Sequence, residues 1–343
     1  MDKKYGKSSW KVYFEGNFWG HHSKEHAGKE IRIEKEFDWA GHHWLVPAVY
    51  SCGKGLVIDF CMRVSVERIR GFMEKWNLSL ENASYENFTK EQQMQMEIEN
   101  PLCLDFRPCI ELNGNTLRMS HSCRLSFNPC LSEGIFHELE TKEVMEYYGL
   151  DEAFGWVIGR SAFSWTGSHR PEIKKLFLRM EQMPVQIPGP HFSVHESGDT
   201  FTFVHPVSGT KYTLTVEEIE QQSIFEKGFD SEGWLYPRHC LGMSYTMSPE
   251  TDDSIAIFDC YEGDKPMEIR LDENSLESVS RGVRSVAVIG GINEPVTILP
   301  GAVRHRKLHR AYSALHFETV KEDVEWRIVF HVKQFEAASF GLI

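Results

Sequence analysis

The sequence has no long apolar run. The most apolar stretch of its 343 residues, at 285–289, ends at Gly290-Gly291. It is far shorter than the ~18 consecutive apolar residues that a membrane-spanning helix needs. The N-terminal residues MDKKYGKSSWKVYFEG carry positive charge but no apolar core, so we do not expect a secretory signal. The chain is therefore expected to be cytoplasmic and not bound to a membrane.

Closely spaced cysteine pairs are also missing. The chain has eight cysteines, none of them in a Cys-x-x-Cys arrangement. A chain of this length does not need a disulfide scaffold to stabilise its core, and cytoplasmic thiols are kept reduced. We therefore expect eight reduced thiols.

The common short signatures of catalysis are absent as well. Gly53-Lys54-Gly55 is followed by a predicted strand, whereas a phosphate loop is followed by a helix. His137-Glu138 and His195-Glu196 each lack the second histidine of a zinc-protease motif, and Ser161 lacks the second glycine of a nucleophile elbow. The sequence therefore favours a non-catalytic binding or interaction protein. The alternative is a metal-assisted hydrolase whose catalytic residues are dispersed along the chain.

The chain is acidic, with 37 Lys and Arg against 50 Asp and Glu, a formal net charge of −13. Such a field repels phosphate backbones, so nucleic acid is not expected as a partner. One basic run, at residues 304–310, is either a solvated segment or a docking patch for an acidic partner or a phosphate, and the partner expected for the chain is an unidentified protein or small ligand. The residues predicted to bind that partner are Arg304, Arg306, Lys307 and Arg310.

Apolar residues alternate with polar ones along much of the chain. Because successive side chains of a strand point to opposite faces, this pattern predicts half-buried antiparallel strands. Turn residues separate the runs, and Asn113-Gly114-Asn115 predicts a hairpin in which Cys109 faces Met119. The fold class predicted is α+β, predominantly antiparallel, built from sandwich- or barrel-like units. The clearest alternating segments are residues 10–18, 31–39, 56–64, 212–216 and 324–330.

Few helices are expected. Val66, Ile69 and Met73 share a helical face, which predicts a helix over 66–76 capped by Ser65. A second helix is predicted over 141–148. Thr215 and Glu218 have capping-box spacing and predict a third, short helix. Residues 89–99 fit either a capped helix or a strand.

A proline-rich segment predicts the division into domains. Three prolines fall within residues 184–190, and proline is excluded from helix interiors and central strands. The predicted domains are therefore residues 1–183 and 191–343, both rich in β-structure.

The predicted metal site depends on a second hairpin. If residues 242–262 fold back about 248–253, the ends of the two strands bring together four residues of the types that bind zinc. The metal predicted is zinc, and its predicted ligands are His239, Cys240, Asp259 and Cys260.

Several segments resemble uncharacterised proteins of anaerobic Gram-positive bacteria. The resemblance covers most of the chain and brings no known activity, so it implies no substrate or site residues. The segments that carry it are PAVYSCGKGLVIDFC (47–61), HPVSGT (205–210), YTLTV (212–216), YPRH (236–239) and MSYTMSP (243–249).

Overall fold

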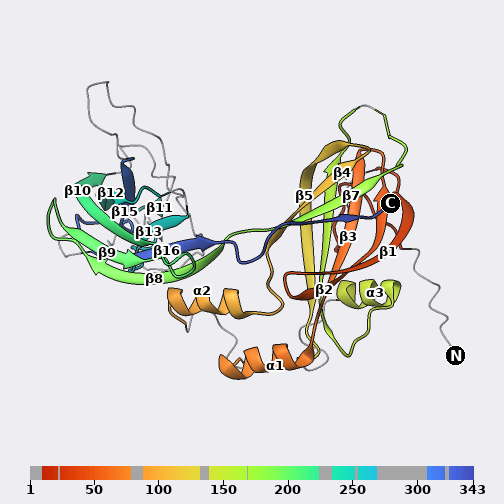
Figure 1. Cartoon of the computed structure of the whole chain (residues 1–343), viewed down its shortest axis with the longest axis horizontal. Coiled ribbons are helices and arrows are strands. Elements are labelled where there is room, and N and C mark those ends of the chain that lie inside the picture. Colours follow the sequence, from red (N-terminus) through yellow and green to blue (C-terminus); the bar gives the residue numbers. More distant parts are fainter. Residues whose placement is uncertain are drawn as a thin grey trace, which may run out of the picture. The chain divides into compact units, whose positions relative to one another are not determined.

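The computed structural model describes residues 10–21, 24–78, 88–131, 139–167, 169–223, 234–251, 254–268, 307–320 and 324–343. Within these residues the chain is mostly antiparallel β-sheet with three helices, which confirms the predicted fold class. The chain divides into two compact units (Figure 1). Unit 1 comprises Met1–Val185 with Lys333–Ile343, and unit 2 comprises Gln186–Val332.

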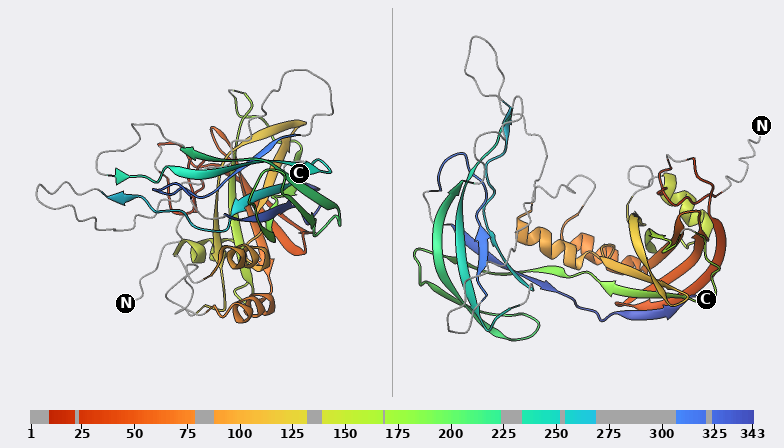
Figure 2. Two further views of the ribbon diagram at one scale, coloured as in Figure 1. Left: turned by 90° about the vertical axis from the view of Figure 1, so that its left-hand side faces the viewer. Right: turned by 90° about the horizontal axis from the view of Figure 1, so that it is seen from above.

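Unit 1 is built on one eight-stranded sheet that curls into a nearly closed barrel, as the right-hand view of Figure 2 shows. Its strand order is β1-β2-β3-β6-β5-β4-β7-β17. Phe37 on β1 stacks on Phe340 of β17 at 3.8 Å between ring centroids, so the two edge strands approach each other. The strands are β1 (Lys29–Trp39), β2 (His42–Ser51), β3 (Gly55–Val64), β4 (Phe106–Leu112), β5 (Asn115–Phe127), β6 (Gly155–Ser164), β7 (Leu176–Gln182) and β17 (Ala338–Gly341).

The alternation along β3 explains how the sheet is buried on both faces. Leu56, Ile58 and Phe60 point into the main core of unit 1. Val57 and Cys61 point to the opposite face and belong to two smaller clusters there. Those clusters are completed by the N-terminal segment 10–21, which contributes Val12 and Phe14, and by helix α3 (Leu139–Tyr148), which contributes Val144 and Met145.

Helices α1 (Val66–Lys75) and α2 (Lys90–Glu99) begin where their capping residues predict, whereas α3 begins at Leu139, two residues before the predicted start of the helix over 141–148. The Ser65 side chain accepts a hydrogen bond from the Arg68 amide at the start of α1. Thr89 and Gln92 form a reciprocal capping box at the start of α2, which resolves the ambiguity of that segment in favour of a helix.

Unit 2 contains two sheets that share one apolar core. One has the order β15-β12-β10-β9, and the other β13-β16-β8. A further two-stranded sheet pairs β11 with β14. The strands are β8 (Val185–Ser193), β9 (Thr200–Val204), β10 (Lys211–Ser223), β11 (Trp234–Leu235), β12 (His239–Ser248), β13 (Ile255–Asp259), β14 (Met267–Glu268), β15 (His309–Tyr312) and β16 (Glu325–Val332).

Three local predictions differ from the structure. The alternating segment 10–18 is not a strand, and its one bridge residue, Asn17, pairs only with Gly20. The helix expected from Thr215 and Glu218 is wrong, because both residues lie within strand β10. The hairpin at Asn113-Gly114 is present, but Leu112 pairs with Asn115, one residue out of the expected register. Both Asn113 and Gly114 have positive φ, as a two-residue hairpin turn requires.

The boundaries of the two units differ from those of the predicted domains. The segment with the three prolines overlaps β8, which is an edge strand of its sheet, a position that tolerates proline. The last eleven residues belong to unit 1, because β17 pairs with β7 from Ala338↔Met180 to Gly341↔Phe177. Unit 1 is therefore formed from both ends of the chain. None of the three helices described is long and apolar enough to cross a membrane.

Acid is expected to destabilise unit 1 through His42. Burial, aided by the Arg68 guanidinium, lowers the pKa of His42 to about 4, whereas an unfolded histidine has a pKa of about 6.5. The contribution of neutral His42 to stability is therefore complete above pH ~6.5 and is lost as the pH falls towards 4. The free energy of unfolding of the wild type is expected to fall between pH 7 and pH 4. In His42→Gln this fall should be smaller by about 1–2 kcal/mol, a figure that is reduced because His42 is partly exposed.

Urea denaturation at a series of pH values measures this effect. His26 is exposed, so His26→Gln is the matched control and is expected to leave the pH profile unchanged. A profile for His42→Gln that superimposes on that of the wild type would contradict the assignment.

Candidate metal centre

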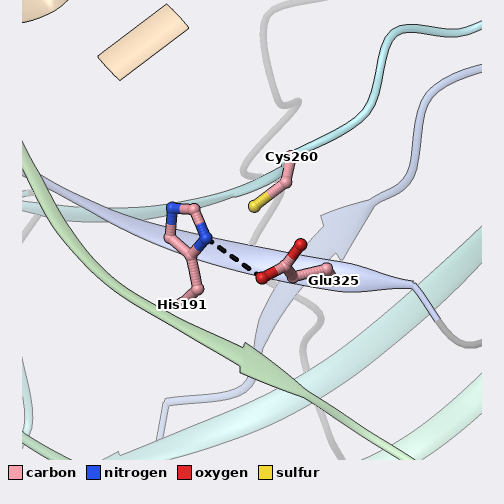
Figure 3. A group of neighbouring side chains, drawn as sticks. All are labelled: His191, Cys260 and Glu325. Carbon is pink, nitrogen blue, oxygen red and sulfur yellow. Dashed lines mark hydrogen bonds and ion pairs between the residues drawn. The ribbon is translucent and has the colours of Figure 1, made fainter. Parts of the chain in front are cut away.

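Three neighbouring strands of unit 2 each place one metal-ligand type at the same point of their sheet. Glu325 is the first residue of the central strand β16, Cys260 directly follows β13, and His191 lies on β8. The Cys260 amide donates a 2.9 Å hydrogen bond to the Glu325 carbonyl, which fixes these two residues side by side. Figure 3 shows the three side chains pointing toward one another.

The group lies on the face of the sheet turned away from the core. Trp326 and Phe192, which follow Glu325 and His191 in sequence, both belong to the buried core of unit 2. Since side chains alternate along a strand, Glu325 and His191 point to the other face. Their side chains are 39% and 38% exposed, so a metal ion from solvent can reach them.

The distances suit a single small cation. His191 Nδ1 lies 3.1 Å from Glu325 Oε1, and the ligand atoms of all three residues lie within 4.8 Å of one another. Around a tetrahedral zinc, bond lengths of about 2.0–2.3 Å place neighbouring ligand atoms about 3.3–3.6 Å apart. The group therefore needs to contract by only about 1 Å to hold zinc.

Hydrogen bonds to the backbone fix the corner that carries Cys260. The two oxygens of Asp259 accept hydrogen bonds from the amides of Tyr261 and Ala314, both at 2.9 Å. Further along, Asp264 donates its amide to the Leu315 carbonyl at 2.9 Å and accepts the Phe317 amide at 2.7 Å. Two acidic residues thus hold the corner against residues 314–317, so its backbone does not have to become ordered when metal binds.

Tyr261 supports the carboxylate of the group. The negative charge of Glu325 is the main cause that raises the pKa of Tyr261, and its hydroxyl also hydrogen-bonds that carboxylate. Such outer-shell hydrogen bonds orient metal-binding carboxylates. Tyr261 is 58% exposed, so it leaves the group open to solvent.

The structure does not bring the four predicted ligands together. The predicted 242–262 hairpin is wrong, because β12 pairs with β10 and β15, while β13 pairs with β16 in the other sheet. Among the described residues only one group of three ligand types converges, and Cys260 is its only member from the predicted set. Asp259 has both oxygens occupied by backbone amides, so its structural role is to hold the corner.

The other two predicted ligands lie on β12. His239 forms an isolated backbone bridge with His316. Cys240 is completely buried, and this burial raises the pKa of its thiol.

The basic run falls partly outside the described residues. Arg304 and Arg306 lie outside them. Lys307 and Arg310 are exposed, and Arg310 lies on β15 opposite Ser244. A docking role for this run stays a prediction.

Sequence reasoning missed His191 and Glu325. They are separated by 134 positions in sequence, and neither is part of a short ligand motif. The alternation of apolar residues at 324–330 places Glu325 on the outer face of a strand, which is the one usable signal. The strand order β13-β16-β8, which brings the three residues together, is not encoded in any local pattern.

No protein-family model, curated protein or solved structure matches the chain. The resemblance to bacterial proteins noted in the sequence stays a prediction, and the assignment of this site depends on its geometry.

Proposed function

We propose that this protein is a binding protein that takes up one zinc ion through His191, Cys260 and Glu325. The observation that carries the proposal is the convergence of an imidazole, a thiol and a carboxylate from three adjacent strands within 4.8 Å. Zinc accepts all three ligand types, whereas magnesium and calcium prefer oxygen ligands. The single soft thiolate therefore favours zinc over these harder cations.

A metal-assisted hydrolase is the second candidate, and the number of ligands favours it. Structural zinc sites have four protein ligands, whereas catalytic sites have three and keep one position for water or substrate. The group has three protein ligands, and two of them are more than one third exposed. Zinc-dependent turnover of an ester or phosphate ester, lost in Cys260→Ala, would establish this reading over simple binding.

The Cys260 thiol also bears on where in the cell the protein acts. A zinc ligand of this kind must stay reduced, which suits a cytoplasmic protein. We propose that location, with an unknown protein or small ligand as the partner of the zinc-loaded chain.

Zinc binding to the purified full-length chain tests the proposal. We expect one zinc per chain by calorimetry and metal analysis. Loss of a ligand is expected to weaken binding more than loss of an outer-shell partner, which typically costs 10–100-fold. Cys260→Ala and His191→Ala should therefore each weaken zinc binding by more than about 100-fold, and Tyr261→Phe by about tenfold.

The controls use residues of the same types outside the group. Cys109→Ala, on β4 of unit 1, and His195→Ala, in unit 2, are expected to bind zinc like the wild type. Failure of the wild type to bind zinc, or unchanged affinity in both ligand variants, would disprove the proposal.

A further inference from the structure

Cys260 is the only sulfur ligand in the proposed metal group, and this has consequences for regulation. We propose that a hydroperoxide oxidises Cys260 and thereby releases the zinc ion, so that metal occupancy follows the redox state of one thiol. This inference rests on the proposed zinc binding.

Access and membership of the metal group together distinguish Cys260 from the other seven cysteines. Oxidation requires a thiolate that a peroxide can reach. Cys52, Cys61 and Cys240 are buried to 1% exposure or less, which protects them. Cys260 is partly exposed, as are Cys103, Cys109, Cys123 and Cys130. Among the described residues only Cys260 belongs to the metal group, and zinc binds cysteine as the thiolate.

Because the group has only three protein ligands, oxidation of one of them is enough to release the zinc ion. With Cys260 oxidised, two protein ligands remain, His191 and Glu325. Two oxygen or nitrogen ligands do not hold zinc as a closed set of three or four does. The other seven cysteines, all in the described part of the chain, are not members of the group, so no neighbouring ligand can form a disulfide with Cys260.

The chemistry balances with the peroxide as oxidant. The Cys260 thiolate sulfur attacks one peroxide oxygen, an S–O bond forms and the O–O bond breaks. The sulfur loses two electrons and becomes a sulfenic acid, and the second oxygen leaves as hydroxide. Two equivalents of a small thiol then restore the Cys260 thiol through a mixed disulfide, releasing water and the oxidised small thiol.

Hydrogen peroxide added to the zinc-loaded full-length chain, with a chromogenic chelator present, tests the proposal. We expect release of one equivalent of zinc, and rebinding after a thiol reductant is added and the chelator removed. Cys260→Asp replaces the sulfur by a carboxylate, which still binds zinc but cannot be oxidised. It should retain zinc at a peroxide concentration that empties the wild type. Cys130→Ser, which removes a partly exposed thiol of unit 1, should behave like the wild type.

The outcomes separate the two proposals. A wild type that binds no zinc disproves the proposed function itself. Zinc that stays bound after peroxide, or that leaves Cys260→Asp as fast as the wild type, disproves redox control alone.

If Cys260→Asp fails to bind zinc, trapping of sulfenic acid with a 1,3-dione, followed by peptide mass spectrometry, decides the matter. Labelling of Cys260 in step with zinc release supports the proposal, and zinc release with Cys260 unlabelled overturns it.

Discussion

Replacing Asp59 by alanine is expected to lower the free energy of unfolding of unit 1 by about 3–5 kcal/mol. Asp59 is fully buried, and Arg160, directly opposite it on β6, is 4% exposed. Two hydrogen bonds of 2.8 Å join Arg160 Nε and Nη2 to the two carboxylate oxygens. The variant leaves the guanidinium buried without its counter-charge, which costs far more than the loss of a surface pair.

Neighbouring side chains keep the Arg160 guanidinium away from solvent. Tyr148 donates its hydroxyl to Asp59 Oδ2 at 2.6 Å, and the aromatic rings of Phe18 and Trp10 lie 4.3 and 5.4 Å from the Arg160 guanidinium carbon. The N-terminal segment and α3 therefore cover the pair, and Arg160 cannot reach water without displacing them.

Urea denaturation of matched variants measures this cost. Asp105→Ala breaks the pair between Arg124 and Asp105, which is 67% exposed at the carboxylate, and should cost less than about 1 kcal/mol. The double variant Asp59→Leu with Arg160→Met removes both charges and should recover most of the stability lost in Asp59→Ala. Equal effects of Asp59→Ala and Asp105→Ala would contradict the burial of the pair.

The second large effect is expected for Gly55→Ala. A Cβ at this position would overlap the backbone carbonyl of Phe163 and the ring of Phe14. Gly55 is the first residue of β3, and the overlapping carbonyl belongs to the paired strand β6, so it cannot move without breaking that pairing. We expect a loss of about 3 kcal/mol or more, at the upper end of the cost of overpacking.

Gly53→Ala is the matched control, two residues earlier in the same turn. A Cβ at Gly53 meets no atom within 4 Å, and its φ is one that alanine adopts readily. This variant should be neutral or more stable by up to about 1 kcal/mol, through the reduced entropy of the unfolded chain. If Gly55→Ala and Gly53→Ala had the same melting temperature, the close packing of Gly55 against Phe14 and against strand β6 would be contradicted.

Much of the fold follows from the alternation of side chains. The pattern at 56–64 predicts β3, because the same alternation that marks a strand also divides its residues between two apolar clusters. The helix predicted from Thr215 and Glu218 was wrong because their spacing fits a capping box and a strand equally well. Leu214 and Val216, buried in the core of unit 2, favour the strand, and tertiary packing overrides the local helix signal.

The candidate site was harder to predict, because it depends on which strands pair. After Ser248 the chain leaves the sheet of β12 and enters the other sheet as β13. The sequence contains nothing that distinguishes this crossing from a simple hairpin. As a result Cys260 pairs across to Glu325, and the expected partners His239 and Cys240 stay in the other sheet.

X-ray absorption at the zinc edge of the zinc-loaded protein tests the central claim most directly. The group formed by His191, Cys260 and Glu325 predicts a single sulfur ligand at about 2.3 Å, with nitrogen and oxygen ligands at about 2.0–2.1 Å. The sulfur shell should vanish in Cys260→Asp and persist in Cys240→Ala. Two sulfur ligands, as a site containing both Cys240 and Cys260 would give, or none at all, would contradict the proposed centre.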